Sequence, residues 1–457
     1  MKLLSETLNE DKRVQEAKKI LIEAVKDHQK NIHGIRAPTL EKRIPYQELL
    51  EELVEKRGTP LALPYLGSGF GKGPFVELLD GSIKYDFITG IGVHYLGHSH
   101  EILINAALDA ALSNTALQGN LQQNQDSLEL MKMLTKLSGL DRCFLTTSGA
   151  MANENGLKIA FQHRFPANRV LAFSNGFCGR TLALSQITDK ASFREGLPLN
   201  YSVDYLPFYD PNRHEESIEA CIKKLKEYLQ RYPKQHAVLI AELVQGEGGV
   251  YVGNKEFFQR IIELIKKEGI LLLVDEVQSF GRLPEIFAFQ YYQLDSFVDI
   301  ATIGKLSQVC ATLYKKELTP KVGLLSQTFT SSTAVIKVSQ ALINHLVSNN
   351  FYGENGLINQ ISSYFHEKLQ VLANKYPSII QGPFGIGAMV AFTVFKGDLK
   401  KTVNFIKKLF EDGVMTFYAG QIPTRVRLLI PVGVISKDDI DKAISIIEKC
   451  LINCNEE

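Results

Sequence analysis

The chain has 457 residues, of which 45% are hydrophobic and 22% are charged, and its formal net charge is +1 at pH 7. This composition is typical of a globular protein, and the length favours more than one domain. Because Lys and Arg are interspersed with Asp and Glu, the sequence offers no basic face for nucleic acid.

Residues 1–73 are expected to form an N-terminal helical segment. Apolar residues at helical spacing predict helices over residues 11–30 and 46–57, and the run from Gly58 to Pro60 ends the second helix. We expect a flexible loop in the glycine-rich run over residues 67–73. A nucleotide-binding phosphate loop is an alternative, but Gly73 stands where that motif requires Ser or Thr.

Residues 74–333 are expected to form a large domain. It opens with a hairpin whose strands cover residues 75–79 and 83–87. Helix-period segments then alternate with short apolar strands, which we expect over residues 143–146, 170–173, 237–242, 270–275 and 300–303. Apolar strands separated by helices are typical of a mainly parallel sheet covered on both faces.

Residues 334–457 are expected to form a smaller C-terminal domain of the α+β type. A long helix over residues 334–347 leads into it, and a strand over residues 426–429 and a capped helix from Ser436 end it. The predicted fold class is therefore α/β, with a large domain built on a mainly parallel sheet between helices and a smaller α+β domain.

The cysteines and the N-terminus bear on the cellular compartment. The six Cys residues form no CxxC pair, which favours a reducing environment. The N-terminus turns polar too soon for a signal peptide, and no apolar run approaches the ~20 residues that span a bilayer. We therefore expect a cytoplasmic protein without a membrane partner.

Polar groups follow five of the predicted strands at their carboxyl ends. In an open parallel sheet, ligands bind beyond this edge, so we expect these groups to lie together. In chain order they are Ser148-Gly149-Ala150, Phe177 with Arg180, Glu242, Asp275 with Gln278, and Lys305.

Asp275 and Lys305 indicate a particular cofactor. A carboxylate that ends an all-apolar strand is costly to bury unless a cation pairs with it, and a protonated pyridine nitrogen is such a cation. Lys305 is the only lysine between Lys267 and Lys315. A lysine amine of lowered pKa forms a Schiff base with an aldehyde. An acid at the ring nitrogen and a lysine at the aldehyde are what pyridoxal phosphate requires.

The other groups each have a functional and an ordinary structural interpretation. Ser148 and the amides beside it suit a phosphate, although Ser is also a common helix cap. Phe177 can stack on an aromatic ring or pack in the core. Arg180 and Arg427 can bind carboxylates through two hydrogen bonds or form surface ion pairs.

Four motifs in this order resemble the class III aminotransferases, the ornithine, acetylornithine, 4-aminobutyrate and lysine 6-aminotransferase group of fold-type I enzymes that depend on pyridoxal phosphate. Matching stretches extend from about Val76 to Ile435 and cover most of the chain. The motifs are Thr147-Ser148-Gly149-Ala150 with Ala152-Asn153-Glu154, Phe177-x-Gly179-Arg180-Thr181, Glu242-x-Val244-Gln245-Gly246-Glu247-Gly248-Gly249, and Val274-Asp275-Glu276-Val277-Gln278.

The resemblance implies roles in cofactor binding. Lys305 would form the Schiff base and shuttle protons, Asp275 would hold the pyridine nitrogen, and Phe177 would stack on the ring. Thr328 would reach a phosphate in the neighbouring subunit, which implies a homodimer with shared active sites. The remaining cofactor contacts would come from Ser148, Gly149, Ala150 and Gln278.

The resemblance also implies how substrates bind. Arg427 would bind a carboxylate of 2-oxoglutarate, and Glu247 would pair with Arg427 when an ω-amino substrate enters. Arg180 would hold the far carboxylate, and Glu242 belongs to the same substrate-binding group. We therefore expect transfer of the ω-amine of lysine, ornithine or 4-aminobutyrate to 2-oxoglutarate.

The chain departs from the family pattern in two segments. Leu306-Ser307-Gln308-Val309-Cys310 replaces a glycine-rich run and is most similar to the lysine 6-aminotransferase branch, and Phe329-Thr330-Ser331-Ser332 replaces the usual Phe-Gly-Gly-Asn. Two alternatives remain open. One is an aminomutase or racemase with the same cofactor, and the other is a catalytically silent, aminotransferase-like dimer.

Overall fold

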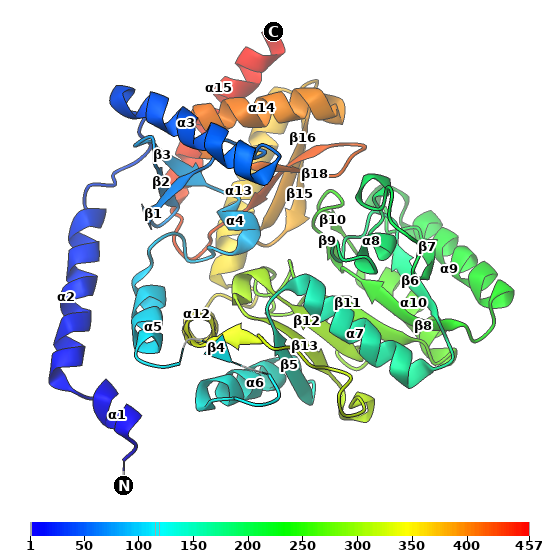
Figure 1. Cartoon of the computed structure of the whole chain (residues 1–457). Coiled ribbons are helices and arrows are strands. Elements are labelled where there is room, and N and C mark those ends of the chain that lie inside the picture. Colours follow the sequence, from blue (N-terminus) through cyan, green and yellow to red (C-terminus); the bar gives the residue numbers. More distant parts are fainter. Residues whose placement is uncertain (1, 115, 118, 457) are drawn as a thin grey trace. The chain divides into compact units, whose positions relative to one another are not determined.

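The computed structural model describes residues 2–114, 116–117 and 119–456, and the chain divides into two compact units (Figure 1). One unit combines the N-terminal part up to Ser113 with Leu357–Pro383 and the C-terminal part from Val390. The other consists of Asn114–Gly356 and Phe384–Met389. The division into segments 1–73, 74–333 and 334–457 as separate domains stays a prediction.

A seven-stranded sheet forms the centre of the second unit (Figure 1). Its strand order is β5-β13-β12-β11-β8-β6-β7. β13 is antiparallel to both of its neighbours, and the other described pairings are parallel. The bounds are β5 Arg142–Thr146, β6 Arg169–Phe173, β7 Ser202–Leu206, β8 His236–Ala241, β11 Leu271–Asp275, β12 Ile300–Ile303 and β13 Cys310–Tyr314.

All five predicted strands of this sheet are confirmed, with shifts of one residue at some ends. They run in the same direction, because β13 reverses the chain between β12 and β5 and so leaves those two strands parallel. Their carboxyl ends therefore share one edge. Two further strands, β7 and β13, were not predicted.

Helices cover both faces of the sheet, as expected for parallel strands. On one face, Val170 and Ala172 of β6 join a buried cluster with Leu157 of helix α7 (Gly149–Arg164). On the other, Phe173 packs against Phe257 of helix α10 (Lys255–Lys267), with ring centroids 5.5 Å apart.

Gly156 lets α7 approach the sheet closely. A Cβ atom at this position would lie 2.5 Å from Cδ1 of Leu273 and 3.3 Å from Cγ2 of Ile300. The close approach brings the first turn of α7 down to the carboxyl ends of β11 and β12. The other elements of this unit are β4 Ala116–Leu117, α6 Gln125–Ser138, α8 Leu184–Ile187, α9 His214–Arg231, β9 Val244–Gln245, β10 Tyr251–Val252, α11 Ala288–Tyr291, β14 Ser331–Ser332 and α12 Thr333–Ser348.

The first unit contains two smaller sheets, with strand orders β1-β2-β3-β17 and β15-β16-β19-β18; β15 and β16 extend into residues grouped with the other unit. Its elements are α1 Leu4–Asn9, α2 Lys12–Gln29, α3 Leu40–Arg57, β1 Gly67–Lys72, β2 Phe75–Leu78, β3 Ile83–Asp86, α4 Thr89–Gly92, α5 Glu101–Ala111, α13 Leu357–Lys375, β15 Ile380–Ile386, β16 Met389–Val394, α14 Leu399–Glu411, β17 Val414–Met415, β18 Phe417–Ala419, β19 Arg425–Leu429 and α15 Lys437–Glu456.

The glycine-rich run is a strand, so the expectation of a flexible loop there is wrong. β1 (Gly67–Lys72) pairs in antiparallel fashion with β2, and Gly71 lies opposite Val76. A Cβ atom on Gly71 would collide with the Phe75 carbonyl and the His98 side chain. The glycine is therefore needed for close packing. In addition, α3 begins at Leu40, six residues before the predicted start at Tyr46, and accommodates Pro45 in its interior.

Within the described residues, no helix combines the length and the apolar character that crossing a membrane requires.

Candidate active site

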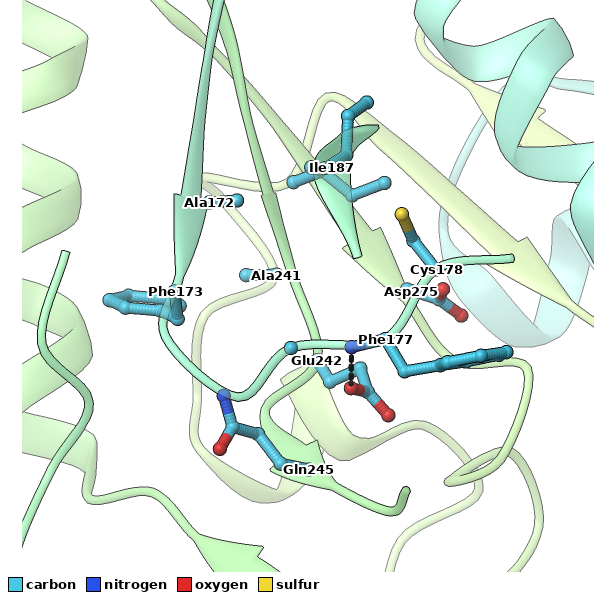
Figure 2. Close-up of a pocket in the computed structure, with 11 residues that line it drawn as sticks. Ala172, Phe173, Phe177, Cys178, Ile187, Ala241, Glu242, Gln245 and Asp275 are labelled. Carbon is cyan, nitrogen blue, oxygen red and sulfur yellow. Dashed lines mark hydrogen bonds between the residues drawn. The ribbon is translucent and has the colours of Figure 1, made fainter. Parts of the chain in front are cut away.

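The predicted polar groups meet at the carboxyl edge of the seven-stranded sheet. Asp275 is the last residue of β11, Glu242 follows β8, and Lys305 lies two residues beyond β12. Figure 2 shows Asp275, Glu242, Phe177 and Cys178 around a small pocket at this edge. Asp275, at the end of β11, pairs with Thr302 of the neighbouring strand β12, and Lys305 follows three residues after Thr302.

Hydrogen bonds hold both carboxylate oxygens of Asp275. The backbone N–H of Val277 donates to Oδ1 at 2.9 Å, and Nδ2 of Asn153 donates to Oδ2 at 2.7 Å. The side chain is buried, with 5% of its surface exposed. Burial raises the pKa of Asp275 to about 6, while the Val277 amide, Asn153 and the charge of Lys305 lower it. A cation that entered this pocket would be attracted by a fixed, poorly solvated carboxylate.

Glu242 connects two loops beside the pocket. Its Oε1 accepts the backbone N–H of Phe177 at 2.8 Å (Figure 2). Its Oε2 accepts the backbone N–H of Gly246 at 3.1 Å. Burial, followed by the negative charge of Asp275, raises the pKa of Glu242 to about 8. The two backbone amides and the charge of Lys305 act in the opposite direction. The site therefore favours positive charge.

Lys305 has an uncommon backbone conformation. Its φ of 51° lies in the left-handed region, which non-glycine residues adopt mainly where the surrounding structure imposes it. The preceding Gly304 is tightly packed, since a Cβ atom there would lie 2.9 Å from Sγ of Cys310 and 3.2 Å from Cγ1 of Val277. The backbone N–H of Lys305 also bonds to the Cys310 thiol. The start of this side chain is thus fixed against the sheet.

The start of α7 offers a site for an anion. Ser148 is exposed and caps the helix, because its Oγ accepts the backbone N–H of Met151 at 3.1 Å. The ordinary interpretation of Ser148 as a cap is therefore confirmed, and a phosphate contact stays a prediction. Gly149 and Ala150 are the first helical residues, whose N–H groups have no acceptor within a helix. A side chain at Gly149 would crowd Val277, with Cβ 2.7 Å from Cγ1.

Gln278 is buried and packs against Gly246. A Cβ atom on Gly246 would collide with the side-chain amide of Gln278. Among the residues that the structure describes, Oε1 of Gln278 has no hydrogen-bond partner. A buried amide oxygen without a partner is costly, so this side chain is suited to bonding with a bound molecule.

Cations surround an aromatic pair next to the pocket. The guanidinium of Arg180 lies 3.9 Å from the ring centroid of Phe193 and 6.0 Å from that of Phe177. Nζ of Lys190 lies 4.3 Å from the Phe193 centroid and 3.8 Å from Oε1 of Glu247. Arg180 and Glu247 therefore belong to one cluster of charges, which is suited to a carboxylate-bearing substrate.

Two predicted site residues belong to other segments of the fold. Thr328 is exposed, in the segment before β14, and its neighbour Phe329 exposes 65% of its surface. Arg427 belongs to the other unit, where it is buried in β19 opposite Phe417 of β18. The prediction that these residues share a site with Lys305 stays a prediction.

Sequence reasoning missed a contact of Asn153, which was noted only as part of a motif. Asn153 is the fifth residue of α7 and is almost completely buried. It bonds to Asp275, to the carbonyl of Cys178 and to the Thr302 hydroxyl. An Asn on an otherwise small or apolar helix face, with Gly156, Leu157 and Ala160, was the available signal, since buried amides need partners.

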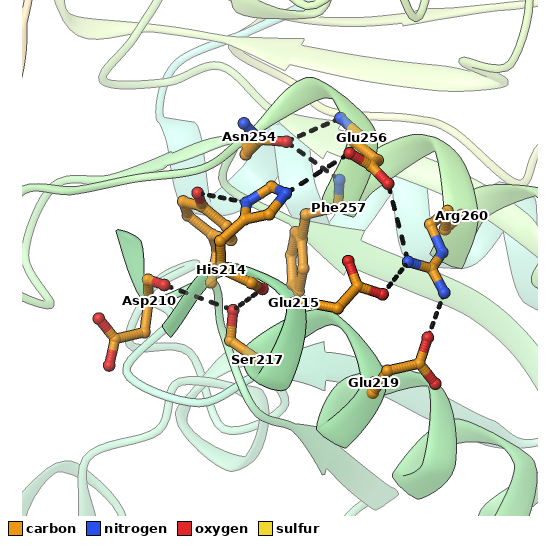
Figure 3. A network of polar contacts seen from close by, with 10 residues as sticks. Asp210, His214, Glu215, Ser217, Glu219, Asn254, Glu256, Phe257 and Arg260 are labelled. Atoms are coloured by element: carbon orange, nitrogen blue, oxygen red, sulfur yellow. Dashed lines mark hydrogen bonds and ion pairs between the residues drawn. The ribbon is translucent and has the colours of Figure 1, made fainter. Parts of the chain in front are cut away.

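The described residues also contain a group with the spacing of metal ligands, His214, Glu215 and Glu256. All three are exposed, and Arg260 forms ion pairs with both glutamates, at 2.8 Å to Glu215 and 3.7 Å to Glu256 (Figure 3). Arg260 also pairs with Glu219. The arginine supplies the positive charge, so this network is a surface link between α9 and α10.

Comparisons with known proteins identify the family of the chain. Residues 68–451 match the family model of the class-III aminotransferases. Acetylornithine aminotransferase of Methanocaldococcus jannaschii is 30% identical over 393 residues, which cover 83% of this chain and 92% of that protein.

Solved structures share the fold. Lysine aminotransferase from M. tuberculosis has a TM-score of 0.78 at 22% identity, covering 89% of this chain and 99% of that one. Ornithine aminotransferase from Toxoplasma gondii has a TM-score of 0.78 at 22% identity, with coverage of 90% and 96%. Because the family match extends over most of the sequence, the chain belongs to the class III aminotransferases, fold-type I enzymes that use pyridoxal phosphate to transfer amino groups.

Proposed function

We propose that the protein is an ω-aminotransferase that takes the side-chain amine of a basic amino acid and transfers it to 2-oxoglutarate. The observation that carries this proposal is the juxtaposition of the buried Asp275 carboxylate with Lys305 at the ends of two paired strands. The relatives described above are named as aminotransferases of acetylornithine, lysine or ornithine, which supports an ω-amino donor. 4-Aminobutyrate remains a further candidate donor.

The residues at the sheet edge fit pyridoxal phosphate. When bound, the cofactor supplies an aldehyde that joins amines and a ring that accepts electrons. Asp275 would hold a proton at the ring nitrogen, and the amine of Lys305 would bond to the aldehyde carbon and move protons at the neighbouring carbon. Phe177 would cover the ring, and the amide of Gln278 would bond to the phenolic oxygen. The amides at the start of α7, with Ser148, would hold the phosphate.

The charged cluster beside the pocket would orient the substrate. Arg180 would bind a carboxylate of the donor or of 2-oxoglutarate, because a guanidinium matches a carboxylate in geometry and charge. Glu247 would pair with Arg427 while an ω-amine occupies the site. Glu242 is assigned to the substrate side of the pocket, where its bonds to Phe177 and Gly246 keep the two loops in place.

We also propose that two copies form a homodimer with shared active sites. Thr328 would contact the phosphate in the partner subunit. The exposed apolar side chains near it support an interface, since Phe329 exposes 65% and Leu121 exposes 84% of its surface. The absence of CxxC pairs from the sequence supports a cytoplasmic location.

The test is an amine panel with measurement of glutamate. Purified protein loaded with pyridoxal phosphate is incubated with 2-oxoglutarate and lysine, ornithine, N-acetylornithine or 4-aminobutyrate. We expect glutamate with at least one donor, and none with Lys305→Ala. Product formed from the amino acid without any 2-oxo acid would indicate an aminomutase or racemase. Bound cofactor with no glutamate from any donor would refute the transfer to 2-oxoglutarate.

A further inference from the structure

Asn153 connects Asp275 to two other parts of the site. One N–H of its amide donates to Oδ2 of Asp275 and the other donates to the carbonyl of Cys178, both at 2.7 Å. Its Oδ1 accepts the hydroxyl of Thr302 at 2.7 Å. The amide therefore joins the end of β11, the middle of β12 and the loop that carries Phe177.

This network fixes the orientation of the amide. If the Asn153 side chain were rotated by half a turn, its carbonyl oxygen would face the Asp275 carboxylate and the Cys178 carbonyl, which offer no hydrogen for a bond. The Thr302 hydroxyl donates to Oδ1 in the observed orientation. All the hydrogen-bonding atoms of the amide are thus used, and an N–H of Asn153 always faces Asp275.

The surroundings of Asp275 give this N–H a specific importance. The ionisable groups that face Asp275 are Glu242, Glu276, Cys178, Cys310 and Lys305. Of these groups only Lys305 is a cation, and its charge lowers the pKa of Asp275. With the Val277 amide, Asn153 supplies the two neutral donors that stabilise the carboxylate.

We propose that Asn153 is a positioning residue, which keeps Asp275 oriented and negatively charged so that it holds the protonated ring nitrogen of pyridoxal phosphate. The inference rests on the proposed role of Asp275 and adds to it the residue through which that role is maintained. Thr302 supports the same function one step further away, because it orients the Asn153 amide.

The experiment measures binding of pyridoxal phosphate to the apoprotein as a function of pH. The chain contains no Trp, so binding is followed by equilibrium dialysis and by the visible circular dichroism of the cofactor. Asn153→Leu removes the donor and keeps a similar volume. A hydrogen bond to a charged group is worth about 10- to 100-fold in an equilibrium constant, so the dissociation constant should rise by this factor at neutral pH.

The pH profile distinguishes positioning from general damage. Loss of the Asn153 N–H raises the pKa of Asp275 further above its ordinary value, so more of the carboxyl is protonated at a given pH. The pH below which affinity falls should therefore move upward in Asn153→Leu. Thr302→Val should show a smaller change in the same direction, and it provides the test if Asn153→Leu does not fold.

A matched control lies two residues further along α7. Asn155 is also buried, and its Nδ2 has no hydrogen-bond partner among the described residues. Asn155→Leu should leave both the affinity and its pH profile unchanged. If Asn153→Leu and Thr302→Val bind the cofactor with the affinity and pH profile of Asn155→Leu, the positioning role is refuted.

A fourth variant separates failure of this inference from failure of the proposed function. Asp275→Ala should lose most of the affinity for pyridoxal phosphate. If Asp275→Ala is impaired and Asn153→Leu is not, only the inference about Asn153 fails. If Asp275→Ala binds the cofactor as the wild type does, the assigned role of Asp275 fails and the inference fails with it.

Discussion

The Glu242 carboxyl gives the fold a pH dependence with a defined sign. Its pKa is raised from 4.5 to about 8 by burial and by the charge of Asp275. Between these values the folded protein retains a proton that the unfolded chain has lost. Compared with a Glu of ordinary pKa, Glu242 therefore does not lower the free energy of unfolding below pH 4.5. Its destabilising effect grows as the pH rises toward 8.

The magnitude follows from the size of the shift. At about 1.4 kcal/mol per pKa unit, the full cost above pH 8 is at most about 5 kcal/mol. It is an upper bound because Glu242 keeps part of its surface exposed and shares the effect with Asp275. Glu242→Gln removes the charge but turns an amide NH₂ toward one of the backbone N–H groups, which costs about 1–3 kcal/mol.

These two effects predict a change of sign with pH. Glu242→Gln should be less stable than the wild type by about 1–3 kcal/mol near pH 5, where Glu242 is neutral in the fold. The difference should shrink as the pH rises, and near pH 9 the variant should be as stable as the wild type or more stable. Urea unfolding of both apoproteins across this range measures the free energies. Parallel pH curves for the two proteins would refute the reasoning.

Two other substitutions test the packing and the charge cluster. Gly156→Ala places a methyl group against Leu273 and Ile300, and overpacking should outweigh the gain in helix propensity and lower the free energy of unfolding by about 1–2 kcal/mol in urea titrations. An unchanged urea midpoint would contradict this. Arg180→Lys keeps the charge but loses bidentate binding, so steady-state kinetics should show KM for 2-oxoglutarate raised about 10-fold with kcat less affected. A loss in kcat alone would contradict a role in carboxylate binding.

The sheet and the family could be predicted from sequence because both depend on local patterns. Short apolar strands between amphipathic helices identified β5, β6, β8, β11 and β12, and the motifs at their ends led to the class III aminotransferases and to pyridoxal phosphate, both confirmed. Strand direction followed from the helical crossovers, which determined that the carboxyl ends share an edge.

Features that depend on distant partners could not be predicted in this way. The chain re-enters the sheet as β13 directly after Leu306–Val309. A sequence in which helices alternate with strands does not indicate this antiparallel pairing. Gly71 of β1 is required by its close approach to Phe75 and His98, which are not visible in the local pattern, so the glycine-rich run was mistaken for a loop. The bond from Asn153 to Asp275 joins residues 122 positions apart and exists only because α7 lies close to the sheet.

A crystal structure of the protein with pyridoxal phosphate would test the central claim most directly. We expect a covalent bond between Nζ of Lys305 and the aldehyde carbon of the cofactor. We also expect the ring nitrogen to lie about 2.7–3.0 Å from a carboxylate oxygen of Asp275. A cofactor attached to another lysine, or a ring nitrogen that faces away from Asp275, would contradict the account.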